Sequence, residues 1–403
     1  MIDYRRRLHG ALAGYRGEPF ELAYWDGARA RFGEGEPAFA IHFRTKDSLA
    51  RSLLETTLGL GEAYVRGDVA FEGDMADALT ALGRAFLEAE PEHLLAGWTR
   101  RALARTLPRQ KADVEHHYGL GVEFFRFFLD EKLTYSCAIF RTPHDTLDEA
   151  QARKVDYTLA KLDLRPGQRL LDLGCGWGHM MFRAAETYGV ECVGITLSDN
   201  QAAYVREQAR ARRLPVEVRT LNYLELDEAE KWDRVVSVGM MEHVGESRAE
   251  QFYDKVRALL APRAVCLLHC IAKMRESPGA DPFVEKYVFP GYWFFSLEGM
   301  TRRAVERGLN VLDVENLRPH YALTGRRWRE NFMRNYDEIK RAMGFDDRFM
   351  RTWEFYLASG EAGFRIGHLN LIQMVASNGV NDDYPLTREH LFAPRPDHAT
   401  TPR

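Results

Sequence analysis

A length of 403 residues is enough for two domains, and 45% hydrophobic and 28% charged side chains are typical of a globular protein rather than a disordered, collagen-like or coiled-coil chain. The formal net charge of -4 argues against a general nucleic-acid-binding protein. No apolar run reaches the roughly 18 residues that a membrane-spanning helix needs, so any membrane contact has to be local.

The start of the chain and the cysteines indicate the compartment. Residues 1–7 are charged and have no apolar stretch behind them, so we expect no signal peptide there. The five cysteines form no C-x-x-C pair, and their number is odd. This pattern favours reduced thiols and gives a metal site little support. We therefore expect a cytoplasmic protein without a bound metal.

Residues 1–95 are predicted to form a small α+β domain. Apolar residues alternate over 20–24 and again over 28–32, on either side of Asp26-Gly27, which is a strong signal for a β-hairpin. A third strand is predicted over 39–43. A helix from about 47 to 58 then leads into a glycine-rich stretch, residues 59–61.

Residues 96–148 are expected to form a helical linker and a lid over substrate and cofactor. Between residues 91 and 111, leucines interleave with arginines. A helix of this composition can lie on an anionic membrane surface, or it can be an interdomain helix whose arginines are simply solvated. The sequence leaves both interpretations open.

Residues 149–385 alternate between strand and helix patterns, and 386–403 form a tail. Helical stretches separate the first five strands, which predicts a parallel sheet with helices on both faces. A ligand is expected beyond the carboxyl ends of these strands. The predicted strands are 169–173, 192–196, 216–220, 234–238, 265–270, 311–314 and 369–375.

A glycine-rich loop follows the first of these strands. Three glycines in five residues let the backbone approach a ligand closely, at Gly174, Gly176 and Gly178. The G-x-G-x-x-G spacing of dinucleotide-binding proteins is absent, and no carboxylate follows the second strand until Asp199. The run 171–178, Leu-Asp-Leu-Gly-Cys-Gly-Trp-Gly, instead resembles the first motif of class I methyltransferases.

Further motifs in a fixed order extend this resemblance, at 133–138, 241–245, 269–271, 286–291, 318–332 and 361–365. Together they resemble the cyclopropane-fatty-acyl-phospholipid synthase family over about residues 110–380. The resemblance implies an α/β class I methyltransferase (Rossmann-like) fold with a seven-stranded, mostly parallel sheet. It also implies S-adenosyl-L-methionine (SAM) as the source of a one-carbon unit. The N-terminal part looks like that of the longer bacterial members, which suggests lipid binding and a homodimer.

The resemblance also implies site residues. In this family the alkene attacks the SAM methyl group, and bicarbonate then deprotonates the resulting carbocation. The matching bicarbonate positions are Cys137, Glu242, His269, Ile271 and Tyr321. The matching cofactor positions are Tyr135, Ser136, Gly174, Gly176, Gly178, Thr196, Leu197, Gln201 and Asn222. Plain alternatives exist, such as a core histidine at His269, a buried small residue at Cys137 or a loop-capping tyrosine at Tyr321.

Two aromatic runs are candidates for an acyl channel, 124–128 and 292–295, although such clusters are usually ordinary core. Several departures from the family pattern surround the substrate: 291–296 replaces a Gly-Gly-x-Leu-Pro-Ser segment, His179 replaces a glycine, and Gly360 replaces a cysteine. Asn222 stands where relatives have an aspartate for the adenine amino group. Its carbonyl can still accept that hydrogen bond.

These departures leave the product open. The expected partner is unsaturated phospholipid at the inner face of the cell membrane, with no nucleic acid. Ring closure gives a cyclopropane, whereas loss of another proton or a hydride shift gives a methyl- or methylene-branched chain. A small-molecule methyltransferase and a lipid-binding scaffold with a vestigial cofactor site are the remaining alternatives.

Overall fold

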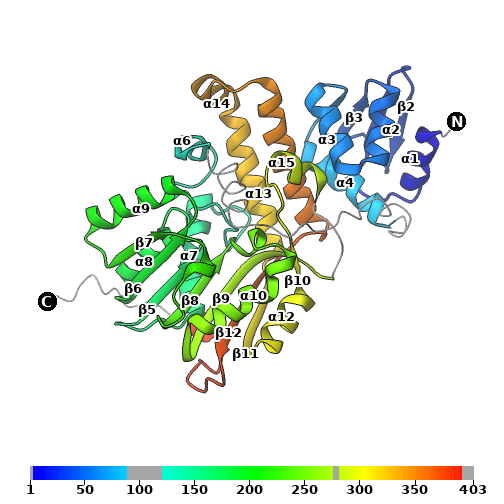
Figure 1. The fold of residues 1–403 in the computed structure, drawn as a ribbon. Coiled ribbons are helices and arrows are strands. Elements are labelled where there is room, and N and C mark those ends of the chain that lie inside the picture. The colour runs from blue at the N-terminus through cyan, green and yellow to red at the C-terminus, as the bar shows by residue number, and fades with distance from the viewer. Residues whose placement is uncertain (1–2, 89–119, 276–280, 393–403) are drawn as a thin grey trace. The chain divides into compact units, whose positions relative to one another are not determined.

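The computed structural model describes residues 3–88, 120–275 and 281–392, and the chain forms two compact units (Figure 1). The first unit comprises Met1–Arg101, Pro278–Pro290 and Ala322–His368, and the second comprises the remaining residues. Two segments placed by the sequence within residues 149–385 thus group with the N-terminal part. The predicted helix over 91–111 and most of the predicted linker lie outside the described residues, as does the end of the C-terminal tail.

A four-stranded sheet forms the centre of the first unit. Its strands are β1 (Phe20–Tyr24), β2 (Arg29–Phe32), β3 (Phe39–Phe43) and β4 (Val69–Glu72), in the order β2-β1-β3-β4. β1 and β2 are antiparallel and joined through Asp26-Gly27, where Gly27 has φ 82°. The predicted hairpin and third strand are confirmed.

Helices complete the first unit. They are α1 (Tyr4–Leu12), α2 (Lys46–Leu54), α3 (Thr56–Arg66), α4 (Met75–Glu88), α11 (Pro282–Tyr287), most of α13 (Arg318–Arg334), α14 (Tyr336–Met343) and α15 (Asp347–Arg365). The single helix predicted over 47–58 is wrong, because Thr56 has φ 51° and separates α2 from α3. The glycines lie inside α3, where close packing requires them. A Cβ on Gly61 would come within 2.4 Å of the Phe283 ring.

The motif at 361–365 anchors an ion network in the first unit. Glu361 is fully buried and accepts hydrogen bonds from Arg326 Nε at 3.1 Å and from Arg329 Nε at 3.0 Å. Arg365 lies 3.5 Å from the same carboxylate, and Arg329 also donates to Asp74 at 2.7 Å. A buried carboxylate needs such partners to offset the loss of water. In this chain the motif therefore belongs to the packing of the first unit and lies outside the described lining of the pocket.

Replacing Gly360 with Ala is expected to raise the free energy of unfolding by about 0.5–1 kcal/mol. Gly360 lies in the interior of α15, and a Cβ there would meet no described atom within 4 Å. Alanine restricts the unfolded chain without straining the helix. Denaturant unfolding of the purified Gly360→Ala variant measures the change, and an unchanged or lower midpoint would contradict the expectation.

The second unit contains the sheet that positions the site. Its strands run β11-β12-β9-β8-β5-β6-β7, with the two-residue β10 (Phe295–Ser296) beside β9. All seven predicted strands are present, as β5 (Arg169–Leu173), β6 (Glu191–Thr196), β7 (Val216–Thr220), β8 (Trp232–Val238), β9 (Leu260–Lys273), β11 (Leu309–Asn316) and β12 (Asn370–Asn378). β5 to β9 pair in parallel, and β12 is antiparallel to β9 and β11. The chain order reverses between β5 and β8, and ligands of such sheets bind at this switch point.

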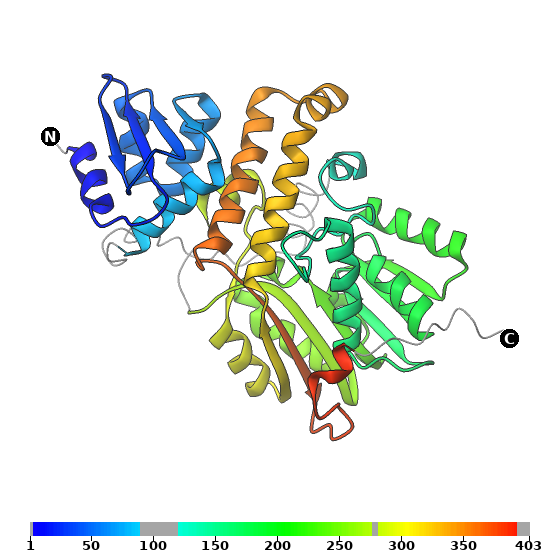
Figure 2. The ribbon, with the colours of Figure 1, turned by 180° about the vertical axis from the view of Figure 1, so that it is seen from behind.

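Helices cover both faces of this sheet, as predicted. α10 (Ala249–Leu259) and α12 (Leu297–Glu306) pack on one face (Figure 1). α7 (Leu147–Lys161), α8 (His179–Tyr188) and α9 (Asp199–Arg212) pack on the other (Figure 2). α6 (Val122–Arg126) precedes them. The helix expected between β7 and β8 is wrong, because Asn222 and Glu225 cap a single 3-10 turn there, η1 (Tyr223–Glu225).

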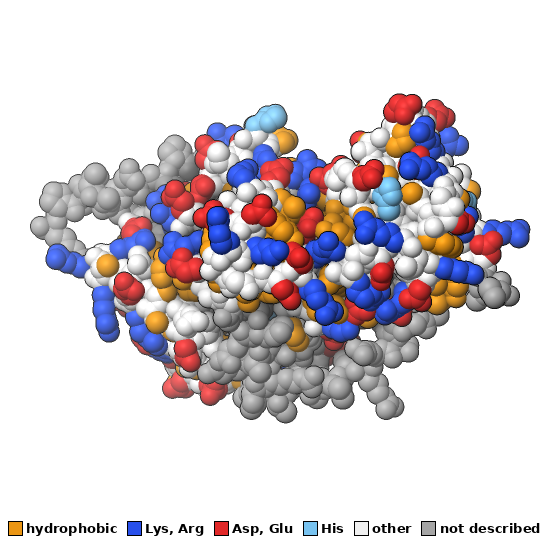
Figure 3. Space-filling model, turned by 90° about the horizontal axis from the view of Figure 1, so that it is seen from above, with side chains coloured by type: hydrophobic (Ala, Val, Ile, Leu, Met, Phe, Trp, Pro, Cys, Tyr) orange, Lys and Arg blue, Asp and Glu red, His pale blue; other side chains and the backbone are white. Residues whose placement is uncertain are grey.

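The surface carries both signs of charge. On the face in Figure 3, Lys and Arg side chains are interspersed with Asp and Glu, and apolar side chains lie between them. Within the described ranges, no helix is both long enough and apolar enough to cross a bilayer. The basic segment that could contact a membrane, residues 91–111, lies outside those ranges.

Candidate active site

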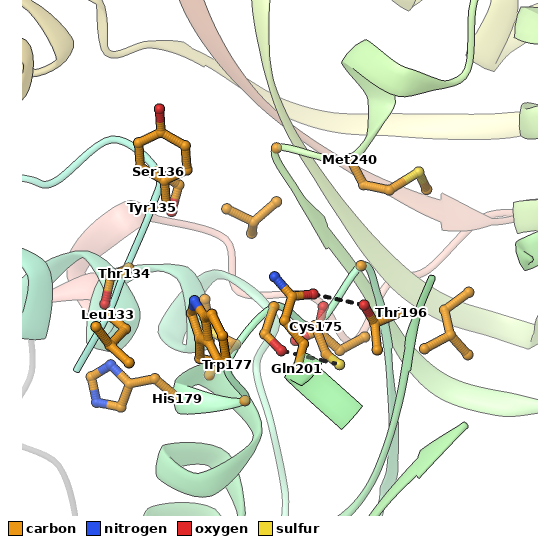
Figure 4. A pocket seen from close by; sticks show the side chains of 18 of the residues that line it. Leu133, Thr134, Tyr135, Ser136, Cys175, Trp177, His179, Thr196, Gln201 and Met240 are labelled. Carbon is orange, nitrogen blue, oxygen red and sulfur yellow. Dashed lines mark hydrogen bonds between the residues drawn. The ribbon is translucent and has the colours of Figure 1, made fainter. Parts of the chain in front are cut away.

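A pocket opens beyond the carboxyl ends of β5, β6 and β8, at the switch point (Figure 4). All nine residues predicted to bind the cofactor line it: Tyr135, Ser136, Gly174, Gly176, Gly178, Thr196, Leu197, Gln201 and Asn222. They come from five separate stretches of sequence. The structure therefore brings together residues that the family pattern had suggested one by one.

The glycine loop between β5 and α8 forms the floor of the pocket. Gly174 has φ 89°, and a Cβ there would lie 2.8 Å from the Cβ of Met240. Gly176 has φ 53°, and its added Cβ would meet no described atom within 4 Å, so that side of the loop is open. A loop of this shape exposes its backbone to a ligand, which explains why glycine is needed.

A hydrogen-bonded turn after β6 fixes the side wall. Thr196 Oγ1 donates to Gln201 Oε1 at 2.7 Å, as Figure 4 shows, and Ser198 N donates to Thr196 Oγ1 at 3.1 Å. Because the oxygen of Gln201 is used inside the turn, its amide nitrogen is the group that can donate into the pocket.

Asn222 lines the pocket from the segment that follows β7. Its Oδ1 accepts a hydrogen bond from Leu224 N at 3.1 Å and so caps η1. The predicted contact between this side chain and an adenine amino group stays a prediction.

Two buried charged groups also line the pocket, and the family pattern did not single them out. Lys154 Nζ on α7 donates to Ser136 Oγ at 3.0 Å. Burial lowers the pKa of Lys154 to about 8, although the nearby Asp130 and Asp172 oppose this shift. Burial likewise raises the pKa of Asp172 to about 7, and Lys154 opposes that shift. This end of the pocket thus offers one cation and one carboxyl group to a ligand.

The five residues predicted to hold bicarbonate adjoin the pocket, although none of them belongs to its described lining. Cys137, Ile271 and Tyr321 meet in a small apolar cluster with Leu317 and Leu371. Cys137 directly follows the pocket residue Ser136, and its thiol donates to Ala138 O at 3.2 Å.

Glu242 joins this cluster to the pocket. It lies in η2 (Met241–His243), between the pocket residues Met240 and His243. Ile271 N donates to Glu242 Oε1 at 2.7 Å, whereas Oε2 is buried without a partner among the described residues. Burial raises the pKa of Glu242 to about 7, and the hydrogen bond from Ile271 opposes this shift. A carboxyl group with this pKa can exchange a proton near neutral pH.

His269 lies two residues before Ile271 on β9 and is fully buried. Gln373 faces it on β12, and the Gln373 amide nitrogen lies 3.0 Å from His269 Nδ1. With that nitrogen donating, the ring proton is on Nε2, which has no partner in the described part of the chain. Burial holds the pKa of His269 well below its usual value, so the ring is a neutral donor.

Replacing Glu242 with Gln is expected to stabilise the fold at pH 8 by about 1–3 kcal/mol. The pKa of Glu242 is about 7 in the folded protein and 4.5 as its ordinary value. Between pH 4.5 and pH 7 the folded protein therefore holds a proton on Glu242 that the unfolded chain has lost. The wild-type stability therefore falls as pH rises through this window, and the Glu242→Gln variant lacks this loss. Denaturant unfolding at pH 5 and pH 8 tests this; an equal gain at both pH values would point to a cause other than titration.

Sequence reasoning missed Lys154, Asp172 and Gln373. One signal was available for Lys154, because Gln151, Lys154 and Thr158 occupy buried positions at helical spacing on α7. Polar residues at such positions mark a site more often than a core. Gln373 gave no signal, since its pairing with His269 depends on the register of β12 against β9.

The two aromatic runs suggested as an acyl channel, 124–128 and 292–295, lie in different parts of the second unit. Phe124, Phe125 and Phe128 are fully buried, and the rings of Phe125 and Phe128 lie 5.4 and 6.1 Å from that of Tyr135. Phe295 belongs to the core beneath β9, with Trp293 packed beside it. Trp293 N also donates to Glu242 O at 2.9 Å. The first run therefore packs against the pocket residue Tyr135, and the second holds the backbone at Glu242.

Fold and pocket define a class I SAM-dependent methyltransferase. The chain resembles the mycolic acid cyclopropane synthase CmaA1 solved with S-adenosylhomocysteine (SAH) and CTAB, at a TM-score of 0.62 and 35% identity over 66% of this chain and 98% of that one. The family profile described as mycolic acid cyclopropane synthetase matches residues 105–374. Residues 8–87 match a profile described as a domain of unknown function.

Two curated relatives narrow the class. A probable fatty acid methyltransferase of Pseudomonas putida is 33% identical over 93% of this chain and 96% of its own length. The cyclopropane-fatty-acyl-phospholipid synthase of Escherichia coli K12 is 33% identical over 86% of this chain and 90% of its own length. The chain belongs to the mycolic acid cyclopropane synthetase family, and it is a SAM-dependent methyltransferase of the cyclopropane synthase type.

Proposed function

We propose that the protein transfers a one-carbon unit from SAM to the double bond of an unsaturated phospholipid acyl chain and closes a cyclopropane ring. One observation carries this proposal: Glu242 Oε2 and His269 Nε2 are both buried without partners among the described residues. Glu242 also accepts a hydrogen bond from Ile271 N, and Ile271 packs against the apolar cluster beside the cofactor pocket. Buried polar atoms are normally hydrogen-bonded, so these two exceptions indicate a place for a small polar species.

The proposed chemistry needs a dry wall and a proton acceptor. Bound SAM supplies an electrophilic methyl group on sulfur. Addition of this methyl to the alkene leaves a carbocation on the acyl chain, which closes to the ring when the new methyl group loses a proton. Ile139, Leu317 and Leu371 exclude water, which would otherwise quench the cation. Bicarbonate bound beside Glu242 would remove this proton, and Glu242 is the titratable group that can receive it in turn.

The residues also fit the bicarbonate that the family resemblance implies. His269 Nε2–H can donate to an anionic oxygen, and Glu242 Oε2 can exchange a hydrogen bond with its hydroxyl. Cys137 and Tyr321 lie in the same cluster and complete the predicted set.

A fatty-acyl C-methyltransferase is the second candidate, supported by the relative from Pseudomonas putida described as a probable fatty acid methyltransferase. It would use the same pocket and the same cation. The products differ in which proton leaves, so a methyl- or methylene-branched chain would form in place of the ring.

Expression in a host that lacks cyclopropane fatty acids tests both candidates. Gas chromatography with mass spectrometry should show a gain of one CH2 on unsaturated chains and no change on saturated ones. Proton NMR then separates ring from branch, because cyclopropane methylene signals lie upfield of other alkyl signals. Unsaturated lipids left unchanged by purified protein with SAM and bicarbonate would overturn the proposal.

We further propose that the protein works as a homodimer at the inner surface of the cell membrane, where phospholipid chains are accessible. Sedimentation with anionic vesicles and light scattering of the purified chain test the two parts. Turnover of a soluble acceptor without vesicle binding would favour a small-molecule methyltransferase instead.

A further inference from the structure

His179 is a pocket residue that departs from the family pattern, which has glycine at this position. It is the first residue of α8 and directly follows Gly178 of the loop. Figure 4 shows its ring extending toward Leu133 and Thr134, on the segment that also carries Tyr135 and Ser136. Its Nδ1 atom is buried and has no partner within the described residues. The pocket wall thus contains an imidazole side chain whose Nδ1 atom is available to a ligand as a donor or an acceptor.

The charges around His179 favour an anion. Burial is the main cause that lowers the pKa of His179, to about 4, and Lys154, Lys132 and two arginines of α8 and α9 lower it further. The ring is therefore neutral at pH 7 and lies in a positive local field. The charged groups that shift its pKa most are all cationic, so a negatively charged ligand group would be attracted to this part of the pocket.

Ser136 points to the same conclusion from the other side. Lys154 Nζ donates to Ser136 Oγ at 3.0 Å, so that oxygen acts as an acceptor toward Lys154. The hydroxyl hydrogen of Ser136 is then directed at a different acceptor. His179, Ser136 and Lys154 all line the pocket and together supply N–H and O–H donors to it. A carboxylate, with about four lone-pair sites, suits such a set.

We propose that His179 is a cofactor-binding residue whose Nδ1–H donates to the carboxylate at the amino-acid end of the SAM molecule. The inference rests on the proposed use of this pocket for SAM. It adds a third partner to the carboxylate beside Tyr135 and Ser136, which the family resemblance already places there. The buried carboxyl group of Asp172 remains for the ammonium group of the same amino acid.

Isothermal titration calorimetry with two probes tests this role. SAH carries the amino-acid end, whereas 5'-methylthioadenosine has the same nucleoside and thioether without it. A hydrogen bond to a charged group is worth enough that His179→Ala should weaken SAH binding about tenfold. The affinity for 5'-methylthioadenosine should stay within about twofold of wild type. The decarboxylated analogue of SAH, which keeps the amine, should also bind equally to both proteins.

Two further variants complete the design. His144→Ala removes an exposed histidine of the same unit and should change neither affinity. His179→Gln retains an N–H donor and should recover part of the lost SAH affinity. Unchanged binding of 5'-methylthioadenosine also shows that the variant is folded.

The outcomes separate this inference from the proposed function. Equal losses for SAH and 5'-methylthioadenosine would reduce His179 to a packing role, and no loss for either would overturn the inference outright. In both cases the proposed function would stand. Failure of the wild-type protein to bind SAH at all would instead overturn the assignment of the pocket.

Discussion

Replacing Glu242 with Gln is expected to lower the rate of acyl-chain modification by about a thousandfold and to leave SAH affinity unchanged. The amide keeps the shape of the side chain, and its oxygen can still accept the hydrogen bond from Ile271 N. It cannot take up a proton, however, so the bicarbonate that deprotonates the acyl carbocation would lack the group that receives its proton. Since Glu242 lies outside the described lining of the cofactor pocket, the loss should appear in kcat rather than in cofactor binding.

The pH dependence gives this expectation a second readout. The pKa of Glu242 is raised to about 7 by burial, so the carboxyl group is protonated below this value and ionised above it. Wild-type turnover should therefore rise between pH 6 and pH 8, with a midpoint near 7. The Glu242→Gln variant should show no such rise in its residual activity.

Glu246 provides a matched control for this experiment. It lies four residues further on, in η3 (Glu246–Arg248), and is exposed to solvent. Glu246→Gln makes the same chemical change in the same loop and should retain wild-type turnover. A Glu242→Gln variant that kept more than about a tenth of the activity would remove Glu242 from the proton-transfer step.

The sequence predicted the sheet of the second unit well because each strand carries a local signal. β5 and β8 are short and mostly apolar, and β5 ends in a glycine-rich loop that predicts a tight turn between a strand and a helix. The helix expected between β7 and β8 failed for a local reason too. Asn222 and Glu225 bond each other's backbone and close a single turn. The break between α2 and α3 at Thr56 had no comparable signal, since threonine rarely adopts a positive φ.

Site residues that belong to a sequence motif could be predicted. Contacts that depend on pairing between distant parts of the chain could not. Glu242 and Ile271 are 29 positions apart, and only the family pattern suggested that both belong to one site. Nothing in the sequence placed Gln373 opposite His269, yet this contact sets the tautomer of the ring. Lys154 went unnoticed because a lysine on a helix is usually solvated, whereas here α7 buries it against Ser136. The tautomer of His269 and the burial of Lys154 thus depend on strand register and tertiary packing, which the local sequence does not reveal.

Replacing Gly174 with Val is expected to weaken SAH binding at least about a hundredfold, which corresponds to about 2.7 kcal/mol. Gly174 has φ 89°, a conformation that a β-branched residue adopts only with strain of about 1–3 kcal/mol. A Cβ would also lie 2.8 Å from Met240 Cβ, a contact that cannot form without movement of the loop after β8. That movement would displace the turn that carries Glu242, so both cofactor binding and turnover should fall.

Gly167 separates the effect on the pocket from the effect of backbone strain. It has φ 80° in the turn before β5, outside the described pocket lining, and its added Cβ would meet no described atom within 4 Å. Gly167→Val should therefore lower the thermal midpoint through a similar strain and leave SAH affinity within about twofold of wild type. Calorimetric titration of both variants, with circular dichroism to verify folding, makes the comparison. If Gly174→Val bound SAH as Gly167→Val does, the loop after β5 would not hold the cofactor, and the assignment of the pocket would have to be given up.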